Sequence, residues 1–328
     1  MRRVFVFIIA LLTALSGCAV NKAREPVSET RILLDTFCTI TVYGKHSASL
    51  VDEALDLCAE YEKLFSMTLE ESDVWRVNHA NGAPVTVSPQ TAELIRAGLE
   101  FGEISGGMFD ITVGKLSTLW DFSGNPRVPS ATELEDARAS VDYRQVIIDG
   151  NSVRLLNPEA WIDLGGIAKG YIADRLADFL EGGGVDGAVI DLGGDVSVVG
   201  AKTDGSLWSI GVRKPFGGRN DLLGIVNTGE ASIVTSGTYE REFVENGILY
   251  HHILDPFTGM PARSDVTGAT VLAESAAAGD ALSTITLLIG SEKAEDLLIN
   301  TQGFIGALLI LENGELLQLG DIGFEAFN

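Results

Sequence analysis

Apolar and polar residues follow two periodicities along the chain. Short runs of alternating or β-branched apolar residues between turn residues predict strands. We expect strands at residues 31–43, 85–87, 146–148, 152–156, 188–192, 196–200, 208–212, 223–227, 231–234, 247–254, 267–272, 305–311 and 315–319. Apolar residues three and four positions apart predict helices, at residues 49–65, 88–104, 132–140, 167–180, 275–289 and 291–299.

The order of these elements indicates the fold class. Most strands follow one another through short turns, as at Asp149-Gly150-Asn151, and the helices are interspersed among them. This order favours an α+β fold with mostly antiparallel sheets over a doubly wound parallel sheet. A chain of 328 residues has room for about two domains, but no internal repeat or linker divides the body, so we expect one domain over residues 31–328.

The first residues have the pattern of a targeting signal. Two arginines precede an apolar run at residues 4–15, which is too short to cross a hydrocarbon core of ~30 Å. The run ends in Leu-Ser-Gly-Cys18, which resembles the lipobox of bacterial lipoproteins. We expect a signal peptide at 1–17, lipidation of Cys18, a tether at 18–30, and a domain anchored to the membrane outside the cytoplasm. The alternative is an ordinary cleaved signal with an incidental cysteine.

Charge and cysteine content limit the partners of the chain. The net charge is −23, from 23 Lys and Arg against 46 Asp and Glu. Such a field repels nucleic acid, so we expect no nucleic-acid partner. A phosphate-bearing ligand must therefore be held by backbone N–H groups, a local Lys or Arg, or a metal. Three cysteines are too few for a disulfide scaffold, and we expect Cys38 and Cys58 to be buried thiols, with a bridge between them as the alternative.

The generic cofactor motifs are missing. Gly182–Gly187 fits the spacing of a dinucleotide-binding loop, but the expected helix precedes it and the expected strand follows it, which is the reverse of what that loop requires. This glycine run is better explained as a helix end and a turn. The four histidines lack the spacing of a zinc site, and neither a P-loop nor a nucleophile elbow occurs.

Two segments carry candidate chemistry for an anionic ligand. Asp280 and Thr284 lie one helical turn apart, so their oxygens share a face and can bind Mg²⁺, although an Asp near a helix start is often only a cap. The segment Asp163–Tyr171 joins a strand to a helix, with glycines that admit a ligand and Lys169 beside the helix N–H groups. The alternative for this segment is an ordinary turn with a solvated lysine.

Two further segments carry a histidine and an aromatic group. His252 and Asp255 flank a turn, where a histidine near a carboxylate can act as a general base or an orienting group, or can merely bond the turn. Met108, Phe109 and Asp110 form an aromatic patch with one carboxylate, which can face a planar heterocycle or can simply end a strand.

The order of the motifs is more specific than any one of them. From about Ile32 to Leu311 the sequence resembles the ApbE family of FAD:protein FMN transferases. The resemblance rests on Met-Phe-Asp-Ile-Thr-Val-Gly, Asp-Leu-Gly-Gly-Ile-Ala-Lys-Gly-Tyr, Asp-Leu-Gly-Gly-Asp, Thr-Ser-Gly-x-Tyr-x-Arg, His-Ile-Leu-Asp-Pro-x-Thr-Gly-x-Pro and Asp-Ala-Leu-Ser-Thr, in that order.

The resemblance implies a fold, an activity and a set of residues. It implies a central FAD cleft, Mg²⁺, and transfer of FMN from FAD to a Thr or Ser of an acceptor protein, such as a subunit of a membrane redox complex. The product is a phosphoester, and AMP leaves. An acceptor sequence of the form Asp-x-x-Thr-Gly-Ala-Thr is implied as well. Carried over by position, the resemblance implies metal ligands at Asp280, Ser283, Thr284 and the carbonyl of Gly166. It implies an FAD site lined by Leu34, Thr68, Met108, Phe109, Asp110, Asp163, Lys169 and Leu254. The implied catalytic candidates are His252 and Asp255.

Two positions depart from the family pattern. Asp35 stands where many members have Gly, and Thr68 stands where many have a Tyr near the flavin and hydrolytic relatives have Asn. Threonine cannot stack on a ring. Hydrolysis of FAD to FMN and AMP is therefore an alternative to transfer. A separate alternative is a flavin-binding or solute-binding lipoprotein without activity.

Overall fold

A computed structural model describes residues 25–44, 48–202, 204–218 and 221–327. The signal peptide at 1–17, Cys18 and most of the expected tether lie outside the described residues, so those predictions stay open. Within the described part of the chain, no helix has both the length and the apolar character that a membrane span requires.

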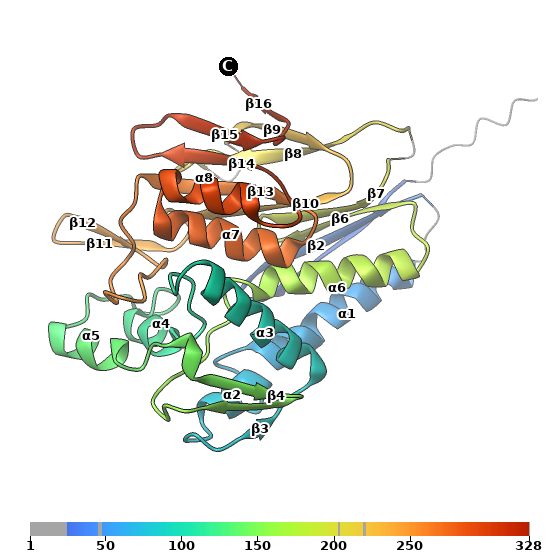
Figure 1. Ribbon diagram of the computed structural model, residues 1–328. Coiled ribbons are helices and arrows are strands. Elements are labelled where there is room, and N and C mark those ends of the chain that lie inside the picture. Colours follow the sequence, from blue (N-terminus) through green and yellow to red (C-terminus); the bar gives the residue numbers. More distant parts are fainter. Residues whose placement is uncertain (1–24, 45–47, 203, 219–220, 328) are drawn as a thin grey trace, which may run out of the picture.

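The centre of the molecule is an eight-stranded sheet in which every neighbouring pair is antiparallel. Figure 1 shows this sheet across the upper half of the molecule. Its strands, in spatial order, are β1 (Val27–Leu33), β2 (Thr36–Tyr43), β6 (Gly187–Leu192), β7 (Asp195–Gly200), β10 (Ala231–Gly237), β13 (Val266–Ala273), β14 (Phe304–Leu311) and β15 (Leu316–Gly320). The predicted α+β class with mostly antiparallel sheets is confirmed.

Three small sheets surround the large one. They are β16 (Phe324–Ala326), β9 (Leu222–Thr228) and β8 (Trp208–Arg213); β3 (Val85–Thr86), β5 (Ser152–Leu155) and β4 (Val146–Asp149); and the hairpin β11 (Glu242–Glu245) and β12 (Ile248–His251). Apolar residues of β8 and β9 pack with those of β10, β13 and β14, so this small sheet covers one face of the large sheet.

Helices cover the opposite face. The helices are α1 (Ala48–Phe65), α2 (Asp73–Asn78), α3 (Pro89–Ile104), α4 (Gly114–Trp120), α5 (Ala131–Arg138), α6 (Ala168–Gly182), α7 (Ala276–Ile289) and α8 (Ser291–Asn300), with a short 3₁₀ helix, η1 (Tyr143–Gln145). Helices α1, α6, α7 and α8 pack on the strands, and α6 lies against α7 (Figure 1). Their buried aliphatic side chains and those of the strands form the main core.

Local sequence explains most helix starts. Ser88, predicted to begin a helix with Pro89, accepts a hydrogen bond from the Thr91 amide and caps α3. The glycine run after α6 ends that helix and leads into β6, as predicted. Cys38 and Cys58 are free, fully buried thiols, which confirms the expectation for them.

Three expectations about elements were wrong. Residues 31–43 are not one strand, because the chain turns at Leu34 and Asp35, which have φ of 54° and 56° and form a two-residue hairpin turn. β1 begins at Val27, so residues 27–30 belong to the folded domain and not to the tether. The strand expected over 247–254 ends at His251.

Candidate active site

The close packing of α6 against α7 brings two of the predicted motifs together. A Cβ on Gly170 would lie 2.2 Å from the Ala276 carbonyl oxygen, so only glycine fits there. The Gly170 amide donates a hydrogen bond of 3.0 Å to Oδ2 of Asp280. The start of α6 is thereby fixed beside the carboxylate on α7.

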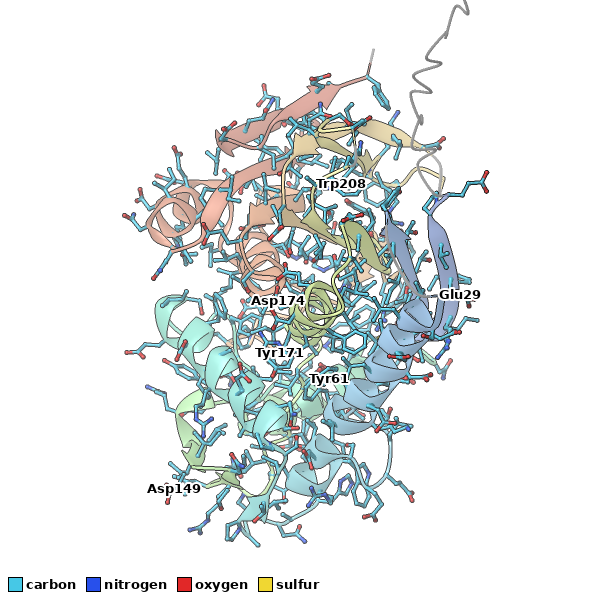
Figure 2. The ribbon with its side chains drawn as sticks, turned by 90° about the vertical axis from the view of Figure 1, so that its right-hand side faces the viewer. Glu29, Tyr61, Asp149, Tyr171, Asp174 and Trp208 are labelled. Atoms are coloured by element: carbon cyan, nitrogen blue, oxygen red, sulfur yellow. The ribbon has the colours of Figure 1, made fainter. Side chains whose placement is uncertain are left out.

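Asp174 fixes the direction of α7. One turn after Gly170 on α6, its Oδ1 accepts from the Ala276 amide at 2.7 Å, and its Oδ2 accepts from the Ser275 hydroxyl at 2.7 Å and the Ala277 amide at 3.1 Å. Figure 2 shows Asp174 on α6. A carboxylate at these N–H groups caps α7 and complements its dipole.

Hydroxyl groups line the face of α7 that carries Asp280. Thr284 follows one turn later and is half-buried. The Ser236 hydroxyl, near the end of β10, lies 2.7 Å from Oγ of Ser283 and 3.4 Å from Oγ1 of Thr284. Ser283 is fully buried and donates to the Asp280 carbonyl at 2.9 Å, so its hydroxyl is engaged by the helix. Thr284 is the more accessible of the two predicted hydroxyl ligands.

The turn before α6 reaches the same place. A Cβ on Gly166 would lie 3.7 Å from Oγ1 of Thr284 and 3.0 Å from Cε2 of Phe109. Gly166 is therefore held between the hydroxyl and the buried aromatic ring. The predicted metal residues Gly166, Asp280, Ser283 and Thr284 form one cluster.

Lys169 and two carboxylates form the charged part of the site. The Lys169 ammonium forms an ion pair with Asp195 at the start of β7, and its Nζ lies 3.9 Å from Oδ1 of Asp280. Asp195 also accepts from the Thr235 amide at 3.2 Å. Burial lowers the pKa of Lys169, but Asp195 and Asp280 outweigh burial and raise that pKa above its ordinary value, so the ammonium stays charged.

Asp280 is 2% exposed, and its charge is only partly balanced. Its pKa is raised to about 6, chiefly by burial. The Lys169 charge opposes this rise, and the neighbouring Asp195 carboxylate contributes to it. One carboxylate with the Thr284 hydroxyl and a backbone carbonyl is a set of hard oxygens that suits Mg²⁺. Within the described ranges, no group of three or more His, Cys, Asp or Glu side chains is placed to hold a metal, so a metal here depends on neutral oxygens and ligand atoms.

His252 follows β12 and lies near the positive charges. Its amide donates to the Arg241 carbonyl at 3.1 Å. Burial lowers the pKa of His252 to about 3, and the charges of Arg241 and Lys169 lower it too, so the imidazole is neutral. Its Nδ1 atom is buried and has no hydrogen-bond partner within the described residues. Such an atom is available to a ligand.

Asp255 does not orient this histidine. Its Oδ1 accepts from the Phe257 amide at 2.7 Å and the Thr258 amide at 3.2 Å, and its amide donates to the Met260 carbonyl. Asp255 therefore holds the turn at residues 255–260. The expected pairing of His252 with this carboxylate is not formed.

The three residues of the predicted aromatic patch have different surroundings. Phe109 is buried beside Gly166 and contacts Phe101 edge to face. The Asp110 carboxylate accepts from the Thr112 amide and hydroxyl at 2.8 and 2.6 Å and from the Tyr143 amide at 2.9 Å, and burial raises its pKa. Asp110 thus shapes the segment. Met108 is half-buried and lines a cavity of about 480 Å³ beside α8.

The remaining predicted residues lie on loops around this cluster. Asp163 accepts from the Gly165 amide at 2.9 Å and forms the turn before α6. Thr68 is exposed, two residues after Ser66, whose Oγ lies 3.2 Å from its hydroxyl. Leu254 is buried with Leu116 and Trp120.

Two contacts join these loops. Val113 bridges to Trp161, and the Trp120 indole donates to the Gly259 carbonyl at 2.8 Å. A Cβ on Gly114 would lie 3.0 Å from Sδ of Met67, so the loop of Thr68 packs at the start of α4. Leu34 lies in the β1–β2 turn, where its amide donates to Oε1 of Glu62 at 2.8 Å, and its contact with FAD stays a prediction.

Sequence reasoning missed several residues of the site. Asp195 and Ser236 lie inside two of the quoted motifs, so their motif membership was the available signal. Asp174 lies four residues after Gly170, on the same face of α6, which is a weaker signal. Arg241 ends the Thr-Ser-Gly-x-Tyr-x-Arg motif, and its carbonyl positions the His252 backbone.

Comparison with known proteins identifies the family. The model of the ApbE family matches residues 34–309. The FAD:protein FMN transferase of Treponema pallidum (strain Nichols) is 32% identical over 324 residues, which cover 92% of this chain and 89% of that protein. The FAD:protein FMN transferase of Klebsiella pneumoniae (strain 342) is 35% identical over 295 residues, which cover 88% and 90%.

Solved structures agree with this assignment. The crystal structure of the ApbE protein of Thermotoga maritima is similar with a TM-score of 0.83 and 35% identity, covering 90% of this chain and 97% of that one. The flavin transferase ApbE of Vibrio cholerae gives a TM-score of 0.78 at 28% identity, covering 93% and 97%. The matched motifs, the fold and the cluster around Asp280 lead to one conclusion: this chain belongs to the ApbE family.

Proposed function

We propose that this chain transfers FMN from FAD to a Thr or Ser hydroxyl of an acceptor protein, as the names of its relatives state for them. One observation carries the proposal: the start of α6 and Lys169 converge on the Asp280 face of α7, with the Gly170 amide 3.0 Å and the Lys169 ammonium 3.9 Å from the Asp280 carboxylate. A fixed ammonium attracts phosphate oxygens even in a chain of net charge −23.

The proposed cofactor is Mg²⁺, held by Asp280, Thr284 and the Gly166 carbonyl. The oxygen donors fit this ion, and phosphate oxygens or water would supply its remaining ligands. When bound, it neutralises charge on the diphosphate as a Lewis acid. The ion pair with Asp195 fixes the Lys169 ammonium, which would then position the phosphates of bound FAD before reaction.

His252 is the proposed proton acceptor. Its imidazole is neutral, and its Nδ1 atom has no other described partner. In the proposed step the acceptor hydroxyl oxygen bonds to the FMN phosphorus and its proton passes to Nδ1 of His252. The bond from that phosphorus to the bridging oxygen breaks, and AMP leaves with the bonding electron pair.

A second candidate function is hydrolysis of FAD to FMN and AMP. The exposed Thr68 favours it, because this side chain provides no ring to stack on the flavin. Water would then take the place of the acceptor hydroxyl at the same phosphorus. Without an acceptor, free FMN would accumulate.

We further propose that the chain is a lipoprotein anchored through Cys18 outside the cytoplasm, with an acceptor in a membrane redox complex. The Leu-Ser-Gly-Cys18 sequence after an apolar run supports the anchor. Labelling cells that make the full chain with a radioactive fatty acid tests it. Label on the parent and none on Cys18→Ala is the expected result, whereas an unlabelled parent would refute the anchor.

The activity test separates transfer from hydrolysis. The protein is incubated with FAD, Mg²⁺ and an acceptor carrying Asp-x-x-Thr-Gly-Ala-Thr, and flavin fluorescence of the denatured acceptor is recorded. Covalent flavin that EDTA prevents supports the proposal. Free FMN on chromatography, without covalent flavin, supports hydrolysis. Thr68→Tyr is expected to raise the ratio of transfer to hydrolysis.

A further inference from the structure

We propose that a groove along the outer edge of β12 binds an extended segment of the acceptor polypeptide as an added strand, with a donor of that segment bonded to Nδ1 of His251. This acceptor groove is lined by β12 and by residues 260–267, with Phe216 and Thr238, and encloses about 680 Å³. The inference rests on the proposed function, which requires a polypeptide hydroxyl beside His252.

The outer edge of β12 is open. The sheet β11–β12 has only these two strands among the described residues, and Figure 1 shows the hairpin projecting from the body. The His252 amide donates to the Arg241 carbonyl. In an antiparallel ladder every second residue pair is hydrogen-bonded, so the backbone groups of His252, Tyr250 and Ile248 point toward β11. Leu249 and His251 fall in the intervening pairs, and their backbone N–H and C=O groups point outward, to the groove.

The same edge is already paired just beyond His252. The Ala262 amide donates to the Ile253 carbonyl at 2.8 Å, and Leu254 bridges to Pro261. After Ala262 the chain departs toward β13, and the edge at Leu249 and His251 is left without this neighbour. A strand bound in the acceptor groove would extend, along the same edge of β12, the antiparallel pairing that residues 261 and 262 already form with residues 253 and 254.

The His251 side chain needs a hydrogen-bond donor. It is 8% exposed, and its Nε2 lies 3.0 Å from the Ala262 carbonyl oxygen, which can only accept. Nε2 therefore carries the hydrogen, and burial lowers the pKa of His251, so Nδ1 is an unprotonated acceptor. Nδ1 is buried and has no partner among the described residues. A backbone N–H or a hydroxyl of the occupant would satisfy it.

The β12 side of the acceptor groove and Phe216 expose apolar side chains, whereas Arg263, Asp265 and Glu312 line other parts of it. Ile248 is 45% exposed, Leu249 41% and Phe216 62%. An open strand edge with apolar side chains beside it is the arrangement by which proteins bind extended peptides. The next residue is His252, whose pKa senses the charges of Arg241 and Lys169. Consecutive side chains of a strand point to opposite faces, so the His252 imidazole lies on the face opposite His251. A peptide that continues along this edge past His251 reaches the chain segment that carries the proposed proton acceptor, which points to the acceptor polypeptide as the occupant.

Binding of a labelled peptide containing Asp-x-x-Thr-Gly-Ala-Thr, followed by fluorescence anisotropy, tests the proposal. Leu249→Arg places a charge in the groove. His251→Phe keeps a buried ring but removes the Nδ1 acceptor, together with the bond to the Ala262 carbonyl. Each is expected to weaken binding by at least about tenfold. Ile147→Arg, at a 44% exposed position on β4, is the matched control and is expected to bind as the parent does.

Hydrogen exchange locates the peptide. Its addition is expected to protect the amides of Leu249 and His251, since both would enter strand hydrogen bonds. Parent-like binding by both groove variants, no binding by the parent, or a dimer of the chain that Leu249→Arg dissociates would overturn the proposal. Flavin transfer in the same samples reports separately on the proposed function, because a peptide can bind without receiving FMN.

Discussion

Replacing Asp280 by Asn should stabilise the metal-free protein while removing its activity. The folded pKa of Asp280 is about 6 against an ordinary value of 3.8, because burial disfavours the charge. Each pKa unit corresponds to about 1.4 kcal/mol. Above pH 6 the charged carboxylate therefore lowers the free energy of unfolding by about 3 kcal/mol. This cost is absent below pH 3.8, where both states are protonated, and it grows as the pH rises to about 6.

The amide that Asp280→Asn introduces would carry no charge but would keep an acceptor for the Gly170 N–H. In EDTA, urea unfolding should show Asp280→Asn to be more stable than the parent by about 3 kcal/mol at pH 8 and by about half of that at pH 5. Mg²⁺ should stabilise the parent and not the variant. Asp136→Asn, on the exposed face of α5, is the control. A variant less stable than the parent at pH 8, or a difference independent of pH, would refute the reasoning.

Three further outcomes follow from the site. Asp174→Ala removes the carboxylate that accepts from two amides in the first turn of α7 and should lower the free energy of unfolding by about 1–2 kcal/mol in urea titrations, whereas an unchanged value would contradict this stabilising role. Because the pKa of His252 is about 3, its NMR signals should not titrate between pH 5 and 8, and a midpoint near 6.5 would contradict its burial. Lys169→Met should weaken FAD binding by at least about tenfold in fluorescence titrations, with retained affinity counting against its role at the diphosphate.

Periodicity predicted the parts of the site that lie on long elements. Asp280 and Thr284 share a face of α7 because the apolar spacing extends over the whole helix. The glycines after Asp163 indicated a turn that brings backbone close to a partner, and the position of Gly166, where a Cβ would lie 3.7 Å from Oγ1 of Thr284, agrees with this. These features depend on neighbours in the sequence, which is why the sequence contained them.

The parts that were missed depend on distant residues or on side-chain direction. Asp174 bonds Ser275, 101 residues away, so nothing near it in the sequence indicates a cap. Asp255 lies three residues from His252 but turns its carboxylate to the amides that follow it. The turn at Leu34 and Asp35 lacks the glycine that usually marks such hairpins, so one strand was expected in place of two.

The mass of the acceptor protein after incubation with FAD and Mg²⁺ tests the central claim most directly. The parent should add one FMN, less one water, to a single Thr or Ser and release one AMP for each FMN added. Asp280→Asn should add none, while Asp296→Asn on the exposed face of α8 should match the parent. An unmodified acceptor with the parent, or equal modification by Asp280→Asn, would contradict the account.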